Sequence, residues 1–302
     1  MNFWELTLHR WILSITVLLL TSLAAFLSDK VGIGNLSIEG NVCLGGFFFS
    51  FFSLWIKNQF FGLTLSILFG ILANLLFFFL LIYMGVNFLI AGIVFNIFTF
   101  TFVPFFLRVY IKTFFIRCLY SNPELFFHWF SAYFLLPFLF LGGMLLYFFY
   151  SPILSNLSVI QYNKKDSRFF FQNSNKYLFF TLAISSGLAI IAGAVSIFNL
   201  GNLFNGQVTG SGFIGLIVAW AVRPLFYRRR ISLFRKDVSR IIFLVFLACI
   251  FSLFAFFDIW EYSRLDNLKN WHYLIFLLSF LKNIPYLTGL LILGFFPSSK
   301  NY

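Results

Sequence analysis

Residues 31–47, VGIGNLSIEGNVCLGGF, are the stretch that decides how this chain folds. Long runs of Phe, Leu and Ile lie on both sides of it, and such runs suit only lipid or a buried core. A carboxylate such as that of Glu39 costs about 2.5 to 3.5 kcal/mol inside a bilayer, so it normally faces a protein interior or a watery path. We interpret the stretch as a glycine-packed or broken segment that lines a translocation path. A short polar loop between two membrane helices is the alternative.

The composition predicts a polytopic membrane protein. Of the 302 residues, 61% are hydrophobic, only 10% are charged and 50 are Phe, and a soluble domain carries far more charge. The formal net charge is +12, but Lys and Arg form short clusters between apolar runs, which indicates contact with lipid headgroups and not with nucleic acid. Cys43, Cys118 and Cys249 are scattered, and they predict neither a disulfide framework nor a metal site.

Apolar runs near the roughly 20 residues that a bilayer requires predict an all-α bundle with about eight or nine transmembrane helices. The long runs are at about 11–27, 61–82, 86–107, 127–149, 177–199, 240–258 and 272–295. Two shorter, glycine-interrupted candidates are 40–56 and 211–222. Short, interrupted segments in both halves of a membrane chain are a known indicator of a transport site.

The largest polar stretch, at about 150–176, carries four basic residues against one acidic residue. The positive-inside rule therefore assigns it to the cytoplasm. It is too short to bury a core of its own, so we expect residues 1–302 to form a single transmembrane domain.

No motif predicts catalysis, a metal site or a cofactor. His9, His128 and His272 have no metal-ligand spacing, and each lies beside an aromatic residue or at the end of a span. We find no carboxylates paired for acid and base chemistry and no glycine-rich phosphate loop.

Polar residues inside the apolar runs are the better lead. Asn87 and Asn96 flank a glycine in GVNFLIAGIVFN, and asparagine amides in membrane helices either bond a neighbouring helix or contact a polar solute. Both roles remain open. Further on, NLGNLFNGQVTGSGFIGL at 199–216 contains Gly210 and Gly212, and backbone this irregular at membrane depth requires a protein-lined environment.

These segments resemble the permease subunits of bacterial ABC importers of the branched-chain amino acid and simple-sugar type, most nearly the nucleoside-importing branch. GIGNLSIEGNVCLGGF resembles the family signature G-x-x-N-I-G-x-E-G-x-x-x-x-G-A-F, with Ser37 in place of a glycine. GVNFLIAGIVFN is similar to G-V-N-E-x-I-x-G-I-x-x-N, with Phe88 in place of Glu. TGSGFIGL resembles A-G-R-G-F-I-A-L, and IPYLTGLLIL looks like the closing L-P-Y-L-L-T-L-L-V-L. The four matches follow the family order and cover most of the chain.

One segment departs from the family. Where its members carry G-E-N-P-x-A-A-x-x-x-G-I-N, which docks on the ATPase, this chain reads VIQYNKKDSRFFFQNSNKY. Only Asn173, Lys176 and Tyr177 remain recognisable there, and the resemblance makes them the candidate docking residues.

The resemblance implies a permease subunit in a bacterial plasma membrane that imports a small polar solute. Its implied partners are a second homologous permease, two cytoplasmic ATP-binding subunits, an extracellular substrate-binding lipoprotein and membrane lipid. We expect Asn35, Glu39, Asn87 and Asn96 to line the path or to form interhelical bonds near it, and Gly210 and Gly212 to form a close-packed gate. A self-contained transporter or channel, driven by an ion gradient through Glu39, is the main alternative, and a membrane enzyme is a third.

Overall fold

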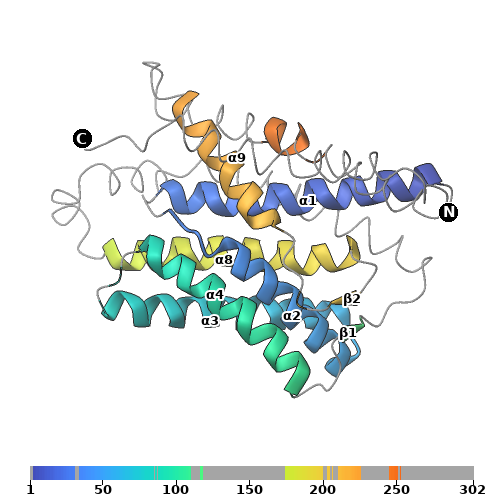
Figure 1. The fold of residues 1–302 in the computed structure, drawn as a ribbon, viewed down its shortest axis with the longest axis horizontal. Coiled ribbons are helices and arrows are strands. Elements are labelled where there is room, and N and C mark those ends of the chain that lie inside the picture. The colour runs from blue at the N-terminus through green and yellow to red at the C-terminus, as the bar shows by residue number, and fades with distance from the viewer. Residues whose placement is uncertain are drawn as a thin grey trace, which may run out of the picture.

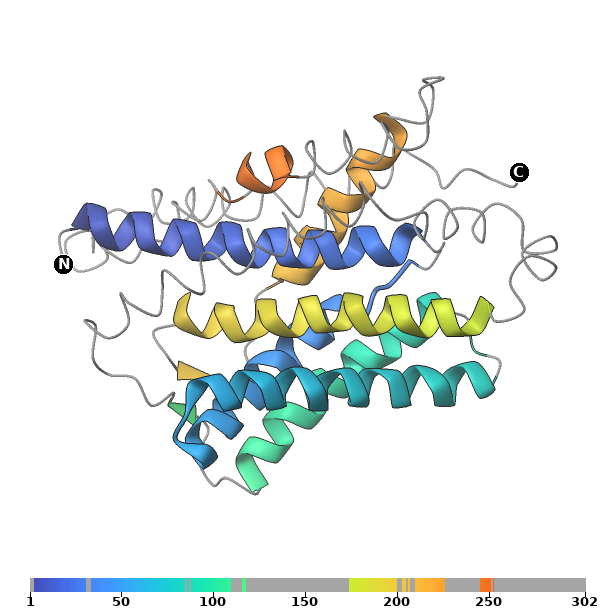
Figure 2. The same cartoon turned by 180° about the vertical axis from the view of Figure 1, so that it is seen from behind.

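The computed structural model describes residues 3–30, 34–84, 86, 88–109, 116–117, 174–199, 203–204, 206, 210–225, 245–250 and 252. Three long helices, α1 (Phe3–Lys30), α8 (Ser174–Asn199) and α3 (Gln59–Tyr83), lie along the long axis of the molecule, with α8 between the other two (Figure 1). Three further helices, α2 (Ile38–Ile56), α4 (Phe88–Val109) and α9 (Ser211–Leu225), cross them obliquely, as the opposite view also shows (Figure 2).

Five of the described helices are long and apolar enough to cross a bilayer. Their apolar parts are Trp11–Asp29, Ile38–Ile56, Gln59–Phe79, Leu89–Val109 and Phe179–Ile197. The prediction of a helical, multi-pass membrane fold is therefore confirmed. The predicted runs 127–149 and 272–295 lie outside the described residues, as does most of 240–258, so the total of eight or nine helices stays a prediction.

Helix α2 is the centre of the bundle, although its mean hydropathy is the lowest of the five spans. It contacts α3, α4, α8 and α9, and every residue from Ile38 to Phe47 is buried. Its glycines explain how α8 comes so close. A Cβ added at Gly45 would collide with the backbone of Ile190, and one added at Gly193 would collide with the carbonyl oxygen of Val42. The two helices therefore pack backbone against backbone, as small residues permit in membrane proteins.

Helices α2 and α3 form a tight hairpin. Lys57 ends α2 in the left-handed conformation, with φ of 58°, and α3 begins two residues later. The side-chain oxygen of Asn58 accepts hydrogen bonds from the backbone N–H groups of Phe60 and Phe61, at 2.9 and 3.4 Å, and so caps the start of α3. Two residues thus terminate one helix and start the next.

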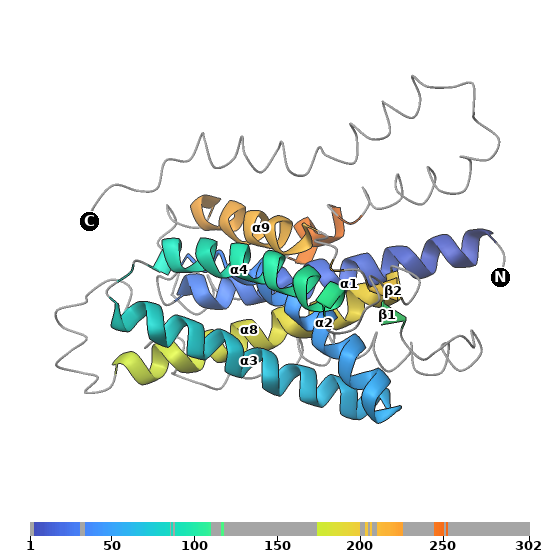
Figure 3. The same cartoon turned by 60° about the horizontal axis from the view of Figure 1, so that its bottom comes forward.

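The described helical bundle contains one addition that the sequence did not predict, a pair of two-residue strands. Strand β1 (Ile116–Arg117) runs antiparallel to β2 (Leu203–Phe204), with Ile116 opposite Phe204. The buried Phe204 ring covers Gly46 of α2, where a Cβ would approach it to 2.9 Å. The pair therefore ties two connecting segments to the side of α2 (Figure 3).

Helices α3 and α4 carry the apolar surface of the bundle. Most of their large side chains that face outward are aliphatic or aromatic, and apolar faces of membrane helices contact lipid. Examples more than half exposed are Phe60, Phe61, Leu68, Leu72, Leu76, Phe79, Ile90, Ile97 and Phe105. Helices α1, α2 and α8 are instead mostly buried, so the polar residues of α2 lie inside protein.

Candidate functional site

The polar residues that the sequence singled out in 31–47 lie at the start of α2 and are buried. Asn35, Ser37, Glu39 and Asn41 are at most 2% exposed. We refer to residues 35–41, together with the side chains that bond them, as the polar hub. Hydrogen bonds join residues 35–41 to α3, α4, α8 and α9. The first turns of α2 are therefore the place where four other helices are held together.

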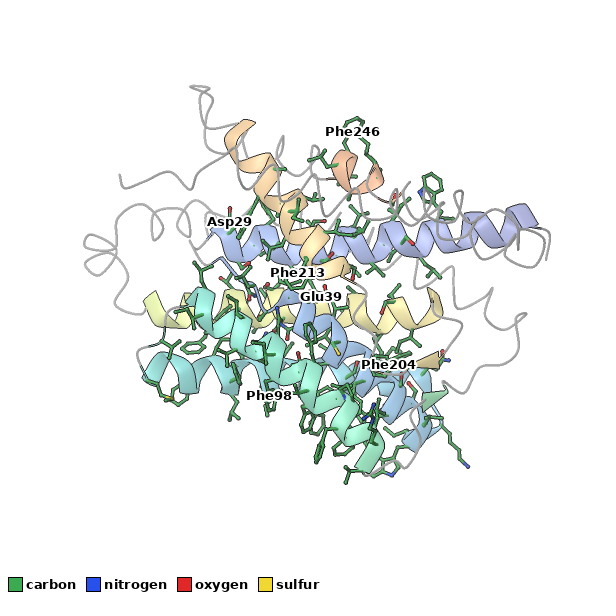
Figure 4. All side chains as sticks on the ribbon, in the orientation of Figure 1. Asp29, Glu39, Phe98, Phe204, Phe213 and Phe246 are labelled. Carbon is green, nitrogen blue, oxygen red and sulfur yellow. The ribbon has the colours of Figure 1, made fainter. Side chains whose placement is uncertain are left out.

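Glu39 joins α2 to α9. Its Oε1 accepts a hydrogen bond from the backbone N–H of Gly210 at 2.7 Å, and its Oε2 accepts from Gly212 at 2.6 Å and from Phe213 at 3.2 Å. Figure 4 shows Glu39 and Phe213 where α2 meets the start of α9. The carboxylate thus satisfies N–H groups that the first turn of a helix leaves free, as an N-cap side chain does.

The electrostatic environment of Glu39 comes from helix ends. The residue lies in the first turn of α2 and caps the first turn of α9. Each helix N-terminus carries roughly half a positive elementary charge, so two such ends converge on one carboxylate. This arrangement compensates a buried negative charge without a basic side chain among its hydrogen-bond partners.

Gly210 and Gly212 let α9 reach Glu39. Gly210 has φ of 72°, a conformation that glycine adopts without strain. A Cβ on Gly212 would lie 2.6 Å from Oε2 of Glu39 and 2.8 Å from its Cα and backbone nitrogen. Only glycine fits at position 212 in this structure. The two predicted gate glycines and Glu39 therefore belong to one contact.

Asn96 joins α4 to the turn before α2. Its Nδ2 donates to the carbonyl oxygen of Leu36 at 2.7 Å, and its Oδ1 accepts from the backbone N–H of Gly40 at 2.8 Å. Gly40 is tightly surrounded, because an added Cβ would lie 2.7 Å from Oδ1 of Asn96 and from Oγ1 of Thr99. The Asn96 amide therefore supplies hydrogen-bond partners for the Leu36 carbonyl and the Gly40 N–H at the start of α2.

Asn35 joins the hub to α8. Its Oδ1 accepts hydrogen bonds from the backbone N–H and the hydroxyl of Ser37, at 3.1 and 2.6 Å, and its Nδ2 donates to Oγ of Ser185 at 3.4 Å. The Ser185 hydroxyl in turn donates to the carbonyl oxygen of Ala24 in α1 at 2.8 Å. This chain of bonds connects α1, α8 and the start of α2.

Asn74 in α3 is a member of the hub that the sequence analysis missed. Its Nδ2 donates to Oδ1 of Asn41 at 2.9 Å, and Asn41 donates to Ser37. The available signal was a single amide within the apolar run GILANLLFFF. Ser185 is a second such member, because its hydroxyl accepts a hydrogen bond from Asn35.

The remaining predicted site residues are Asn87, Asn173, Lys176 and Tyr177. Asn87 and Asn173 lie outside the described residues. Lys176 and Tyr177 lie in the first turn of α8, so the predicted docking segment ends inside a helix. Across the described ranges, no group of three His, Cys, Asp or Glu residues is placed to hold a metal ion.

The fold and the hub define a multi-pass helical membrane protein whose buried polar side chains connect its helices. The family of permease components of branched-chain amino acid transport systems matches residues 7–222. This match covers more than half of the chain, and the chain belongs to that family. Its members are subunits of ABC transport systems, are generally non-catalytic, and associate with ATPase and substrate-binding partners. No curated protein and no solved structure matches the chain significantly.

Proposed function

We propose that this chain is the membrane-spanning permease subunit of an ATP-driven ABC importer for a small polar solute, a nucleoside or a simple sugar. The observation that carries the proposal is the polar hub, because it joins the helices of a transport-family bundle through hydrogen bonds around Glu39. The protein then lies in a bacterial plasma membrane, and its partners hydrolyse the ATP.

The chemistry of the hub supports a neutral, hydroxylated solute. Apart from Glu39, its hydrogen-bonding side chains are amides and hydroxyls, namely those of Asn35, Ser37, Asn41, Asn74, Asn96 and Ser185. Amides and hydroxyls both donate and accept hydrogen bonds, as a sugar or a nucleoside requires. Glu39 is the one acid of the hub, and its two oxygens already accept three N–H donors. We therefore assign Asn35, Asn87 and Asn96 to the path or its immediate support, and Glu39 with Gly210 and Gly212 to the gate.

The docking of the ATP-binding subunits belongs to the segment at about 150–176 in this proposal. Asn173, Lys176 and Tyr177 lie at its end, and the last two are in the first turn of α8. Helix α8 runs from there to the backbone contact with α2. A displacement of the start of α8 by a bound ATPase would therefore be transmitted along the helix to its contact with α2.

Co-purification from gently solubilised membranes tests the proposed assembly. The full chain should recover an ATP-binding protein and a second permease. Replacement of residues 160–172 by a Gly/Ser linker, which leaves α8 intact, should abolish recovery of the ATP-binding protein. The same replacement of 263–270, in the polar stretch between the apolar runs 240–258 and 272–295, is the control and should not. Recovery of this chain alone in native lipid would overturn the proposal and favour the self-contained transporter.

A further inference from the structure

The contact between Glu39 and the start of α9 joins α9 to α2, while α8 packs on both α1 and α2. Helix α9 packs mainly on α1, where Gly215 lies against Thr21 and the Thr21 hydroxyl donates to the carbonyl oxygen of Ser211 at 3.2 Å. Helix α2 packs on α3, α4 and α8 and has little direct contact with α1. Glu39 of α2 accepts three hydrogen bonds from the backbone at the start of α9.

Separating this contact in a dry interior would be costly. With α9 in place, three N–H donors and two helix N-termini compensate the carboxylate. If α9 moves away in a dry interior, the carboxylate and the three donors lose their partners, and each loss is costly for a buried group. Separation therefore requires water to enter and hydrate both sides.

Two described glycines near the start of α9 permit such a movement. Gly206 and Gly210 both have positive φ, at 79° and 72°, and glycine exchanges between such conformations at little steric cost. Hinges are typically a few residues at the end of an element that absorb a change in φ and ψ. Position 210 directly precedes α9 and contacts Glu39, so a hinge there changes the contact itself.

We propose that Glu39 and the backbone N–H groups of Gly210, Gly212 and Phe213 form a latch that opens in each transport cycle and admits water to the polar hub. When it is closed, the latch holds the start of α9 against α2, and α8 keeps α1 and α2 joined whether the latch is closed or open. This inference rests on the proposed function, because it gives the latch a part in the alternation between closed and open states. Glu39 acts in it as a positioning residue for α9.

The chain contains a reporter for water at the latch. Cys43 lies one helical turn after Glu39 on the same side of α2, and it is a free thiol that is 2% exposed. A chain with Cys118→Ser and Cys249→Ser retains only this thiol. Its rate of modification by a water-soluble methanethiosulfonate then measures access of water to this part of α2.

The experiment measures this rate for the full chain in lipid nanodiscs. Glu39→Gln replaces one accepting oxygen by an NH2 group, which then faces at least one of the three backbone N–H donors. It should therefore raise the Cys43 rate by about tenfold or more, the factor that corresponds to the loss of one charge-assisted hydrogen bond. Gly212→Ala should do the same without removing the carboxylate, because its Cβ collides with the Glu39 backbone. Gly187→Ala is the matched control, since its Cβ meets only the end of the Ile71 side chain.

A second thiol distinguishes an open latch from an unfolded chain. Ala189→Cys in the buried part of α8 should remain unreactive in all variants if the bundle is intact. The latch would be overturned if Glu39→Gln and Gly212→Ala left Cys43 as slow as in the parent chain. It would also be overturned if both thiols reacted together, because the contact would then only support the fold.

The assembled transporter tests the part of the latch in transport. With the co-purified ATPase, ATP should accelerate Cys43 modification in the parent chain and have little further effect on Glu39→Gln. An unchanged parent rate during ATP hydrolysis would overturn opening in the cycle. If no ATPase co-purified, the proposed function would be overturned instead. The Cys43 rates of the parent chain and the variants without ATP would still decide whether Glu39 holds α9 in place.

Discussion

Buried polar side chains of this protein act on backbone groups that would otherwise lack a partner. Glu39 accepts hydrogen bonds from three N–H groups at the start of α9. Asn96 donates to a carbonyl oxygen and accepts from an N–H group at the start of α2. An unsatisfied buried backbone group costs about 1 to 3 kcal/mol, so such side chains are important for the stability of the bundle even before any role in transport is considered.

Asn96→Ala should destabilise the protein by about 1 to 3 kcal/mol, because it leaves the Leu36 carbonyl and the Gly40 N–H buried without their present partner. The midpoint of thermal unfolding in detergent measures this change. The control is Thr101→Ala on the same helix, whose exposed hydroxyl bonds only its own helix, and which should stay within about 0.5 kcal/mol. Equal midpoints for the two variants would contradict the bridging role of Asn96.

At the residue scale, the sequence predicted several members of the hub but not how they are connected. Glu39, Gly210 and Gly212 were selected because a carboxylate and clustered glycines are unusual in apolar sequence. Glu39 is more than 170 residues away from these glycines in the sequence, and only the fold brings them into contact. Asn74 was missed because a single amide in an apolar run also fits many ordinary interhelical contacts.

At the element scale, α2 shows why hydropathy alone underestimated a central helix. The segment 40–56 was predicted only as one of two shorter, glycine-interrupted candidates, and its Gly, Ser and Asn residues give it the lowest mean hydropathy of the five spans. In the structure these residues face other helices instead of lipid, where glycines allow close packing and the asparagine has partners. The span with the lowest mean hydropathy is therefore among the most buried ones.

Gly193→Ala should disrupt the backbone contact of α8 with α2. The new Cβ would collide with the Val42 carbonyl oxygen and approach the Gly46 nitrogen to 2.9 Å, and backbone atoms cannot rotate away as a side chain can. Such overpacking typically costs about 1 to 3 kcal/mol. Gly187→Ala, on the same helix, should cost clearly less, and thermal unfolding of both variants compares them. If Gly187→Ala were the more damaging change, the assigned contact between α2 and α8 would be wrong.

The hairpin between α2 and α3 predicts opposite effects at adjacent residues. Asn58→Ala removes the N-cap of α3 and should cost about 1 kcal/mol. Lys57→Gly should stabilise the protein by up to about 1 kcal/mol, because glycine suits the left-handed conformation at φ of 58° better than lysine does. Thermal unfolding of the two variants should shift in opposite directions, and a shift in the same direction would contradict this description of the hairpin.

At the scale of the whole molecule, the bundle consists of buried central helices and lipid-facing outer helices. Helices α1, α2 and α8 are mostly buried, whereas α3 and α4 expose long apolar faces. The composition predicted a membrane protein because its high apolar and low charged content suits helices in lipid. It could not predict which helices are central, since that depends on where glycines and amides find partners in other helices.

The energy source of transport is the central claim, and uptake into membrane vesicles tests it most directly. Vesicles that contain the full assembly should accumulate a labelled nucleoside or simple sugar when ATP is supplied on the cytoplasmic side and the binding protein on the other. Uptake should persist when ionophores remove the proton and sodium gradients, and it should stop with a non-hydrolysable ATP analogue. Uptake that does not depend on ATP but is abolished by the ionophores would contradict the account and make this chain a secondary transporter.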